Sequence, residues 1–307
     1  MNVRLDGKVA VVTGAGGGVG RAYARAFAAA GASVVVNDVG TSVDGSGGPQ
    51  SLAESVVEEI RIAGGSAVAN RDSVADFAAA RRIIDCAIDS FGTIDILVAN
   101  AGIMRPQSVH EASEQDWADV MAVHANGTFN CYRHAISHMI QKNSGTVITT
   151  GAAMAQGYFP GLAAYRAAKA AILSMTLHAA EELRDYNINI NSVTPGSIIT
   201  RMQQTFLASV AARGIDPSGW PSGAAPETVP PLGLFLSSDK GRSITGRAFY
   251  LFPPRTVKAV TSYGALEALS ASGDQWDDGE LDSSLPGWLA RLNDDGSYVS
   301  AHLRVHG

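Results

Sequence analysis

Short apolar runs alternate with helical segments along most of this 307-residue chain, and this alternation limits its fold more than any other feature. The runs are rich in Val and Ile and are continuous, as strands are when both faces of a parallel sheet are covered. They span residues 9–12, 34–36, 67–69, 94–99, 147–150 and 188–193. The pattern predicts an α/β protein with a doubly wound parallel sheet, a Rossmann fold, and with ligands at the C-terminal ends of the strands.

No internal repeat and no domain boundary is evident before residue 255. Residues 1–254 are therefore expected to form one domain, with a substrate lid over residues 196–226, where apolar residues are mixed with Gly and Pro. Candidate pocket residues in the lid, with a plain packing role as the alternative for each, are Met202, Phe206, Leu207 and Trp220. The stretch 255–307 is acidic and rich in turn formers, with Trp276, Trp288 and Leu289 as its main apolar anchors. We expect this C-terminal extension to pack on the domain or on a partner subunit.

The composition argues against several classes of function. The chain is 46% hydrophobic and 17% charged, which is typical of a globular protein. Its net charge of −6 and the lack of a Lys/Arg cluster argue against a nucleic-acid partner. No apolar stretch is long enough to cross a membrane. Cys86 and Cys131 have no metal-ligand spacing, so we interpret both as reduced core thiols. The expectation is a cytoplasmic protein with no metal site and no membrane or nucleic-acid partner.

The segment TGAGGGVG follows the first apolar run and opens a helix. Glycines there allow the backbone to approach a pyrophosphate at the helix N-terminus. The predicted contacts are Gly14, Gly18, Val19 and Gly20. Asp38, at the end of the second run, can accept hydrogen bonds from the adenosine ribose and would repel the extra phosphate of NADP. NAD is therefore the predicted cofactor, and the alternative for Asp38 is that it only begins the following turn.

Tyr165 and Lys169 are four residues apart, which is one turn of a helix. A cation beside a phenol favours the ionised phenol, so we expect the pKa of Tyr165 to be lowered and its side chain to act as a general base. This pairing points to proton transfer at an alcohol or a carbonyl.

Four motifs now stand in order: TGAGGGVG, NAG at Asn100 to Gly102, Tyr165 with Lys169, and PG at Pro195 and Gly196. Over residues 5–252 the chain resembles a short-chain dehydrogenase/reductase. The resemblance implies that Tyr165 takes the hydroxyl proton, that Lys169 holds the nicotinamide ribose and that hydride passes to NAD. It also implies adenine binding at Asp72 and a nicotinamide-facing segment at residues 195–198. The remaining cofactor-binding positions that it implies are Ser73, Asn100, Ala101, Gly102, Pro195, Gly196 and Ile198.

A narrower resemblance lies in GRAYARAFAAAGASVVVNDVG and VVEEIRIAGGSAVANRDSV. These segments are similar to the (3R)-hydroxyacyl-CoA dehydrogenase modules of type-2 multifunctional enzymes and their bacterial relatives. Some of those bacterial relatives oxidise intermediates of sterol side chains or steroid rings. The resemblance implies lipid or steroid metabolism.

Two positions depart from the family pattern. Ala152 stands thirteen residues before Tyr165, where the family has a Ser that positions the substrate oxygen. We hypothesise that Thr150 or Tyr158 supplies part of that hydroxyl function. His124 stands where the family usually has an Asn that relays protons, and an imidazole with a pKa near neutrality could serve instead. The alternative is a core histidine with its hydrogen bonds satisfied.

The predicted function is an NAD-dependent oxidoreductase that interconverts a secondary alcohol and a ketone on a bulky apolar small molecule, such as a 3-hydroxyacyl-CoA or a steroid. Because of Ala152, the alternative is an NAD-binding protein with little or no turnover, in a structural or sensor role. Arg201 could meet an acidic group such as a CoA phosphate, or could lie in solvent. The resemblance further implies a homodimer or homotetramer that pairs the helices holding His124 and Tyr165.

Overall fold

A computed structural model describes residues 3–48, 51–152, 159–220 and 223–251, together with the backbone of residues 252 and 256–260. The chain divides into two units, the first of which comprises Met1–Ala155 and Phe159–Val260. Only this first unit is described below. Tyr158 and the extension anchors Trp276, Trp288 and Leu289 lie outside the described residues.

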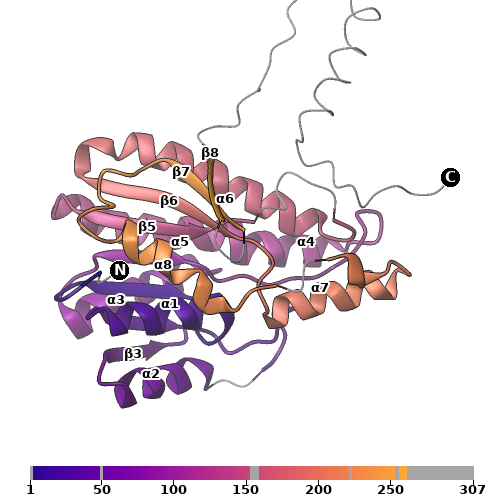
Figure 1. The fold of residues 1–307 in the computed structure, drawn as a ribbon, viewed down its shortest axis with the longest axis horizontal. Coiled ribbons are helices and arrows are strands. Elements are labelled where there is room, and N and C mark those ends of the chain that lie inside the picture. Colours follow the sequence, from indigo (N-terminus) through magenta and orange to yellow (C-terminus); the bar gives the residue numbers. More distant parts are fainter. Residues whose placement is uncertain (1–2, 49–50, 153–158, 221–222, 253–255, 261–307) are drawn as a thin grey trace, which may run out of the picture. The chain divides into compact units, whose positions relative to one another are not determined.

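An eight-stranded sheet forms the centre of the first unit, in the order β3-β2-β1-β4-β5-β6-β7-β8 (Figure 1). All neighbouring strands are parallel except β7 and β8, which are antiparallel. The strands are β1 Val9–Thr13, β2 Ser33–Asn37, β3 Ser66–Asn70, β4 Ile96–Ala99, β5 Gly145–Thr150, β6 Ile188–Pro195, β7 Arg247–Phe252 and β8 Thr256–Val260. The prediction of a doubly wound parallel sheet is confirmed.

The sheet continues past the predicted domain boundary at residue 254. Strand β8 pairs with β7, with Phe249 opposite Ala259 and Leu251 opposite Val257. The run TVKAV alternates apolar and polar residues, which is typical of an edge strand rather than of the continuous core strands used to place the sheet. The first unit therefore extends to Val260, and the C-terminal extension begins after that residue.

Helices cover both faces of the sheet because each has one apolar stripe to bury. One face packs against α1 (Gly18–Ala29), α2 (Leu52–Ile62) and α8 (Pro230–Leu236). The other face packs against α3 (Phe77–Phe91), α5 (Gly127–Gln141) and α6 (Ala163–Glu182). The remaining helical segments are α4 Glu114–Met121, η1 Ala122–Asn126, η3 Arg184–Tyr186, α7 Arg201–Ala212, η4 Pro217–Gly219 and η5 Pro226–Thr228.

Local sequence sets where several of these helices begin and end. Asp76 caps α3 by accepting a hydrogen bond from the Ala79 amide at 2.6 Å, and Gly92 ends the helix in the left-handed conformation. Ser113 caps α4 in the same way, and the π-helical turn η1 joins α4 directly to α5. Among the described residues, no helix is long and apolar enough to cross a membrane.

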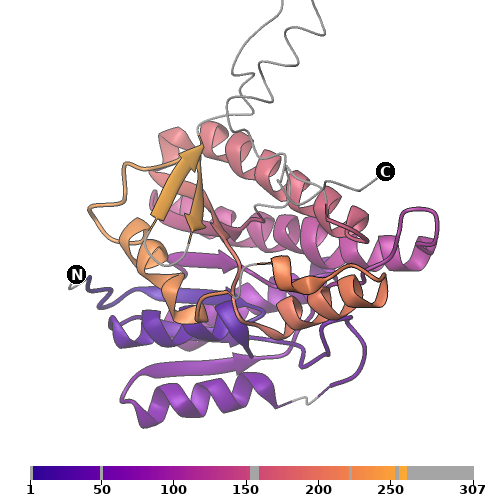
Figure 2. The ribbon, with the colours of Figure 1, turned by 45° about the vertical axis from the view of Figure 1, so that its right-hand side comes forward.

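The strand order reverses between β1 and β4, and in doubly wound sheets ligands bind beyond the strand ends at such a switch point. β1 ends at Thr13, and β4 ends at Ala99. Helices α4 and α7 lie at this same end of the sheet (Figure 2). The topology therefore brings the Gly-rich turn, the NAG segment and the start of α7 to one edge.

Candidate active site

The Gly-rich turn joins β1 to α1 through backbone conformations and contacts that exclude larger side chains. Gly14 and Gly18 have φ of 63° and 51°, in the left-handed region. A Cβ on Gly20 would lie 2.2 Å from the Gly14 carbonyl oxygen, and one on Gly16 would lie 2.6 Å from the Leu52 Cβ. Gly17 caps α1 without any side-chain hydrogen bond, and the first turn, which includes Val19, has no acidic residue. The turn thus fits a dinucleotide phosphate, since the amides in the first turn of α1 have no partner within the helix and the glycines allow close approach to the backbone.

Asp38 lies beside this turn, as predicted. One of its carboxylate oxygens accepts a hydrogen bond from the Gly16 amide and the other from the Gly40 amide, both at 2.8 Å. Its carboxylate is therefore fixed at the end of β2 against the turn. This position suits contact with an adenosine ribose, although Asp38 also orders the loop that follows it.

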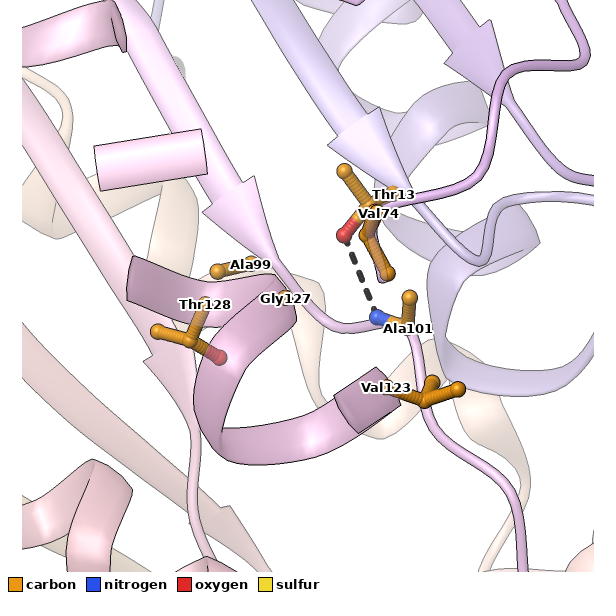
Figure 3. A pocket seen from close by; sticks show the side chains of 7 residues that line it. All are labelled: Thr13, Val74, Ala99, Ala101, Val123, Gly127 and Thr128. Carbon is orange, nitrogen blue, oxygen red and sulfur yellow. Dashed lines mark hydrogen bonds between the residues drawn. The ribbon is translucent and has the colours of Figure 1, made fainter. Parts of the chain in front are cut away.

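The end of β1 and the NAG segment are held together by a residue that the sequence analysis did not assign to the site. The Thr13 hydroxyl oxygen accepts a hydrogen bond from the Asn100 amide at 3.0 Å. It accepts a second from the Ala101 amide at 3.1 Å, which Figure 3 shows. The Asn100 side chain in turn donates to the carbonyls of Thr13 and Gly14 at 3.0 and 3.2 Å. A Thr at a strand end is a weak signal by itself, because its partner amides lie about ninety residues away in the sequence.

A small space behind the NAG segment is drawn in Figure 3. Its lining residues come from β1, β4, η1, α5 and the segments that follow β3 and β4: Thr13, Val74, Ala99, Ala101, Val123, Gly127 and Thr128. It has no room for a water molecule, so it is a packing gap and not a binding site.

Asp72 and Ser73 follow β3, two strands away from β1. The Asp72 carboxylate accepts hydrogen bonds from Arg82 at 2.7 Å and from the Asn70 side chain at 2.9 Å, while the Ser73 hydroxyl accepts one from the Ala75 amide at 3.2 Å. These contacts fix the position of the segment but do not show that it binds adenine. Its role there stays a prediction.

Tyr165 and Lys169 lie on the buried face of α6, as predicted from their spacing. Lys169 Nζ donates a hydrogen bond to the Thr150 carbonyl at 2.6 Å and lies 5.7 Å from the centre of the Tyr165 ring. Burial lowers the pKa of Lys169 to about 7. The end of β5 therefore holds the ammonium group beside the phenol.

The expected lowering of the Tyr165 pKa is wrong for the protein without cofactor. Burial raises the pKa of this phenol, because the ionised form loses its hydration in the apolar surroundings. Lys169 does not offset this effect, since its own charged form is disfavoured by the same burial. The phenol is thus protonated near neutral pH and is ready to donate a proton.

Ala152 packs in the same apolar cluster as Tyr165 and is 9% exposed. The hydroxyl of Thr150 instead donates to the Asn100 side-chain oxygen at 3.3 Å. This contact gives the Thr150 hydroxyl a partner on the NAG side of the site. Its proposed role in holding a substrate oxygen stays a prediction, and Tyr158 lies outside the described residues.

His124 is fully buried in η1. Its Nε2 lies 2.7 Å from the Ile103 carbonyl oxygen and 3.1 Å from the Ile103 amide nitrogen, so it donates to the carbonyl in one neutral tautomer and accepts from the amide in the other. Nδ1 is buried and has no hydrogen-bond partner among the described residues. A Cβ on Gly102 would lie 2.3 Å from the imidazole Cε1, so the Gly of the NAG motif makes room for this ring.

The expectation of a His124 pKa near neutrality is also wrong. Burial is the main cause that lowers the pKa to about 3, the charge of Lys169 adds to it, and the hydrogen bond to Ile103 opposes both. The ring is therefore neutral at physiological pH. Its Nδ1, which has no hydrogen-bond partner among the described residues, is the ring atom available for a hydrogen-bonded relay.

Strand β6 ends at Pro195 and leads through Gly196 to the start of α7. Ile198 is 6% exposed and forms a parallel bridge with Ala224. A Cβ on Gly18 would lie 3.2 Å from the Thr200 methyl group. The chain after β6 thus runs from the sheet to the Gly-rich turn, and the contact of residues 195–198 with nicotinamide stays a prediction.

Comparison with known proteins identifies the family. The model of the short chain dehydrogenase family matches residues 8–210. The chain is 43% identical over 235 residues to the mouse peroxisomal multifunctional enzyme type 2, a match that covers 76% of this chain but 30% of that protein. It is 33% identical to the 3-oxoacyl-[acyl-carrier-protein] reductase FabG of Staphylococcus aureus, over 80% of this chain and 96% of the reductase. The chain therefore belongs to the short-chain dehydrogenase family, and the prediction of an oxidoreductase of this family is confirmed.

Solved structures agree with this assignment. A short chain dehydrogenase from Mycobacterium avium has a TM-score of 0.77 and 36% identity, covering 93% of this chain and 95% of that chain. A short chain dehydrogenase from Mycobacterium paratuberculosis, solved with NAD bound, has a TM-score of 0.74 and 28% identity, covering 81% and 97%. The chain spans only 30% and 51% of the multifunctional relatives from mouse and Dictyostelium discoideum. Among the described residues, no three His, Cys, Asp or Glu side chains are grouped to hold a metal ion.

Proposed function

We propose that this protein is an NAD-dependent dehydrogenase or ketoreductase that interconverts a secondary alcohol and a ketone on a bulky apolar substrate. The observation that carries the proposal is the buried pair of Tyr165 and Lys169, held at the end of β5 by the Thr150 carbonyl. The related structure with NAD bound supports NAD as the cofactor, as do the amides at the start of α1 and the carboxylate of Asp38.

Tyr165 and Lys169 have different roles in the proposed reaction. During alcohol oxidation, the substrate hydroxyl gives its proton to Tyr165 after the phenol has ionised; during ketone reduction, the protonated phenol donates to the carbonyl oxygen. NAD, when bound, takes up the hydrogen and the two electrons that leave the alcohol carbon. Lys169 stays anchored to Thr150, where its positive charge favours the ionised phenol whenever the ammonium form is populated.

The surroundings of Tyr165 support an apolar substrate. Its cluster contains apolar side chains from the residues just after the NAG segment and from α4, α6 and α7, with partly buried side chains packed against it. Phe206 contacts Phe159 and Trp220 with ring centres 5.8 and 5.7 Å apart. The candidate pocket residues therefore gather in one cluster: Met202, Phe206, Leu207 and Trp220.

Within that class, a 3-hydroxyacyl-CoA is the favoured substrate and a steroid alcohol the other. The related FabG is named as a reductase of 3-oxoacyl groups, which supports chemistry at the third carbon of an acyl chain. We further propose a homodimer or homotetramer through α4, α5 and α6, whose exposed Trp117 and Phe129 offer apolar surface. A cytoplasmic location stays a prediction, since several relatives are named peroxisomal.

A turnover screen with NAD across 3-hydroxyacyl-CoA and steroid alcohols tests the proposal. We expect NADH production with at least one substrate, and a loss of roughly 100- to 10,000-fold in Tyr165→Phe with NAD affinity unchanged. The competing function is an NAD-binding protein with little turnover, which Ala152 favours because it offers no hydroxyl to the substrate oxygen. NAD binding without turnover across the whole panel would support that alternative.

A further inference from the structure

Arg201 begins α7, and its guanidinium lies against the Gly-rich turn. Its Nη2 is 3.4 Å from the position that a Cβ on Gly17 would occupy, and the neighbouring Thr200 packs against Gly18. Thr200 caps α7 by accepting a hydrogen bond from the Gln203 amide at 3.2 Å, which fixes the direction in which the helix leaves the turn. The start of the predicted lid is thus in contact with the predicted phosphate site.

The charge of Arg201 is not balanced by another described residue. No hydrogen bond or ion pair joins it to that part of the chain, and its side chain is exposed. Other arginines near this end of the sheet are paired: Arg82 with Asp72, and Arg105 with Asp116 and Asp119. The first turns of α1 and α7 also lack acidic residues. The guanidinium and the positive end of α1 therefore lie at the same turn, where the nearby Asp38 carboxylate is already hydrogen-bonded to the Gly16 and Gly40 amides.

We propose that Arg201 binds phosphate oxygens of the ligand at the Gly-rich turn, and that this ligand is the pyrophosphate of the dinucleotide. The proposal rests on the NAD site of the proposed function. A guanidinium suits phosphate because its N–H groups form a planar fork that matches two oxygens. A phosphate of CoA has the same chemistry, but the contact of Arg201 with Gly17 favours the cofactor. Helix α7 is then part of the cofactor site as well as of the substrate lid.

Binding titrations in the absence of turnover test this proposal. The variant is Arg201→Gln, and Arg184→Gln is the matched control, since Arg184 is an exposed arginine at the far end of α6, near the start of β6. The probes are NADH, ADP-ribose, adenosine and CoA, titrated by calorimetry. We expect Arg201→Gln to weaken NADH and ADP-ribose by roughly 10- to 100-fold, with adenosine and CoA unchanged. Arg201→Lys should recover part of the loss because it keeps the charge.

Three other results for the Arg201 variant overturn the proposal. Unchanged NADH affinity would place Arg201 in solvent, and a loss confined to CoA would assign it to the substrate. An equal loss for adenosine would indicate a distorted site, which thermal unfolding of the apo variant would also reveal. If the wild-type protein binds NADH but turns over no alcohol, the proposed enzymatic function fails while the comparison of variants still decides the role of Arg201. If it does not bind NADH, both fail.

Discussion

His124 and Tyr165 are in edge-to-face contact, with ring centres 5.1 Å apart and planes at 89°. The imidazole is itself held in place by its hydrogen bond to Ile103, so the phenol ring packs against a fixed ring. His124 is therefore interpreted as a positioning residue, and its neutral ring is not a titrating acid or base.

Replacing His124 should lower turnover without changing the pH dependence of turnover. An edge-to-face pair contributes about 0.5–1.5 kcal/mol, so we expect His124→Ala to reduce kcat by roughly 2- to 10-fold or more. Because the pKa of His124 is about 3, the pH–rate profile should keep its shape, and kcat should fall by the same factor at every pH. Stopped assays of kcat from about pH 5 to 9 would show this. Disappearance of one limb of the profile would instead identify His124 as a proton-relay group.

Ala152→Ser should raise activity. The change adds a hydroxyl within the cluster that contains Tyr165, and a positioned donor to a developing oxyanion contributes roughly 100- to 1,000-fold in rate. We expect an increase in kcat of up to that size for a substrate that the wild type already turns over. Ala171→Ser is the control, because it adds a hydroxyl beside the same cluster but on α6 and not after β5. Equal kinetics for wild type and Ala152→Ser would indicate that another group already fills the role.

Much of this site could be predicted because its signals are local in sequence. Continuous apolar runs indicated the parallel strands, and the four-residue spacing placed Tyr165 and Lys169 on one face of a helix. The contact of Lys169 with the Thr150 carbonyl could not be predicted, because a main-chain acceptor leaves no residue signature. The raised pKa of Tyr165 depends on burial by side chains from several segments that lie far apart in the sequence, which no motif describes.

Asp38→Asn should relax the preference for NAD over NADP. The carboxylate would repel a 2'-phosphate on the adenosine ribose, and an amide keeps an acceptor oxygen for the Gly16 amide while removing the charge. We expect the ratio of NADH to NADPH affinity to fall by at least roughly tenfold, or about 1.4 kcal/mol. Fluorescence titrations of both cofactors provide the measurement. Asp44→Asn, in the loop that follows, is the control and should leave the ratio unchanged.

Lys169→Met should change how stability depends on pH. The unfolded chain holds the Lys169 proton up to a pKa of 10.5, whereas the folded protein releases it near 7. Between these values the unfolded state binds more protons, so this residue makes the free energy of unfolding rise with pH, by up to about 1.4 kcal/mol per pH unit. Urea unfolding of the apo protein between about pH 7 and 8.5 should show a smaller rise of this free energy in Lys169→Met than in the wild type.

The Cys131 thiol does not interfere in this pH window. Burial raises its pKa from 9.0 to about 12, so it lowers the free energy of unfolding only at higher pH. Lys240→Met, which removes an exposed charge, should keep the wild-type slope. Parallel curves for Lys169→Met and the wild type would show that Lys169 keeps its proton in the folded protein throughout this window.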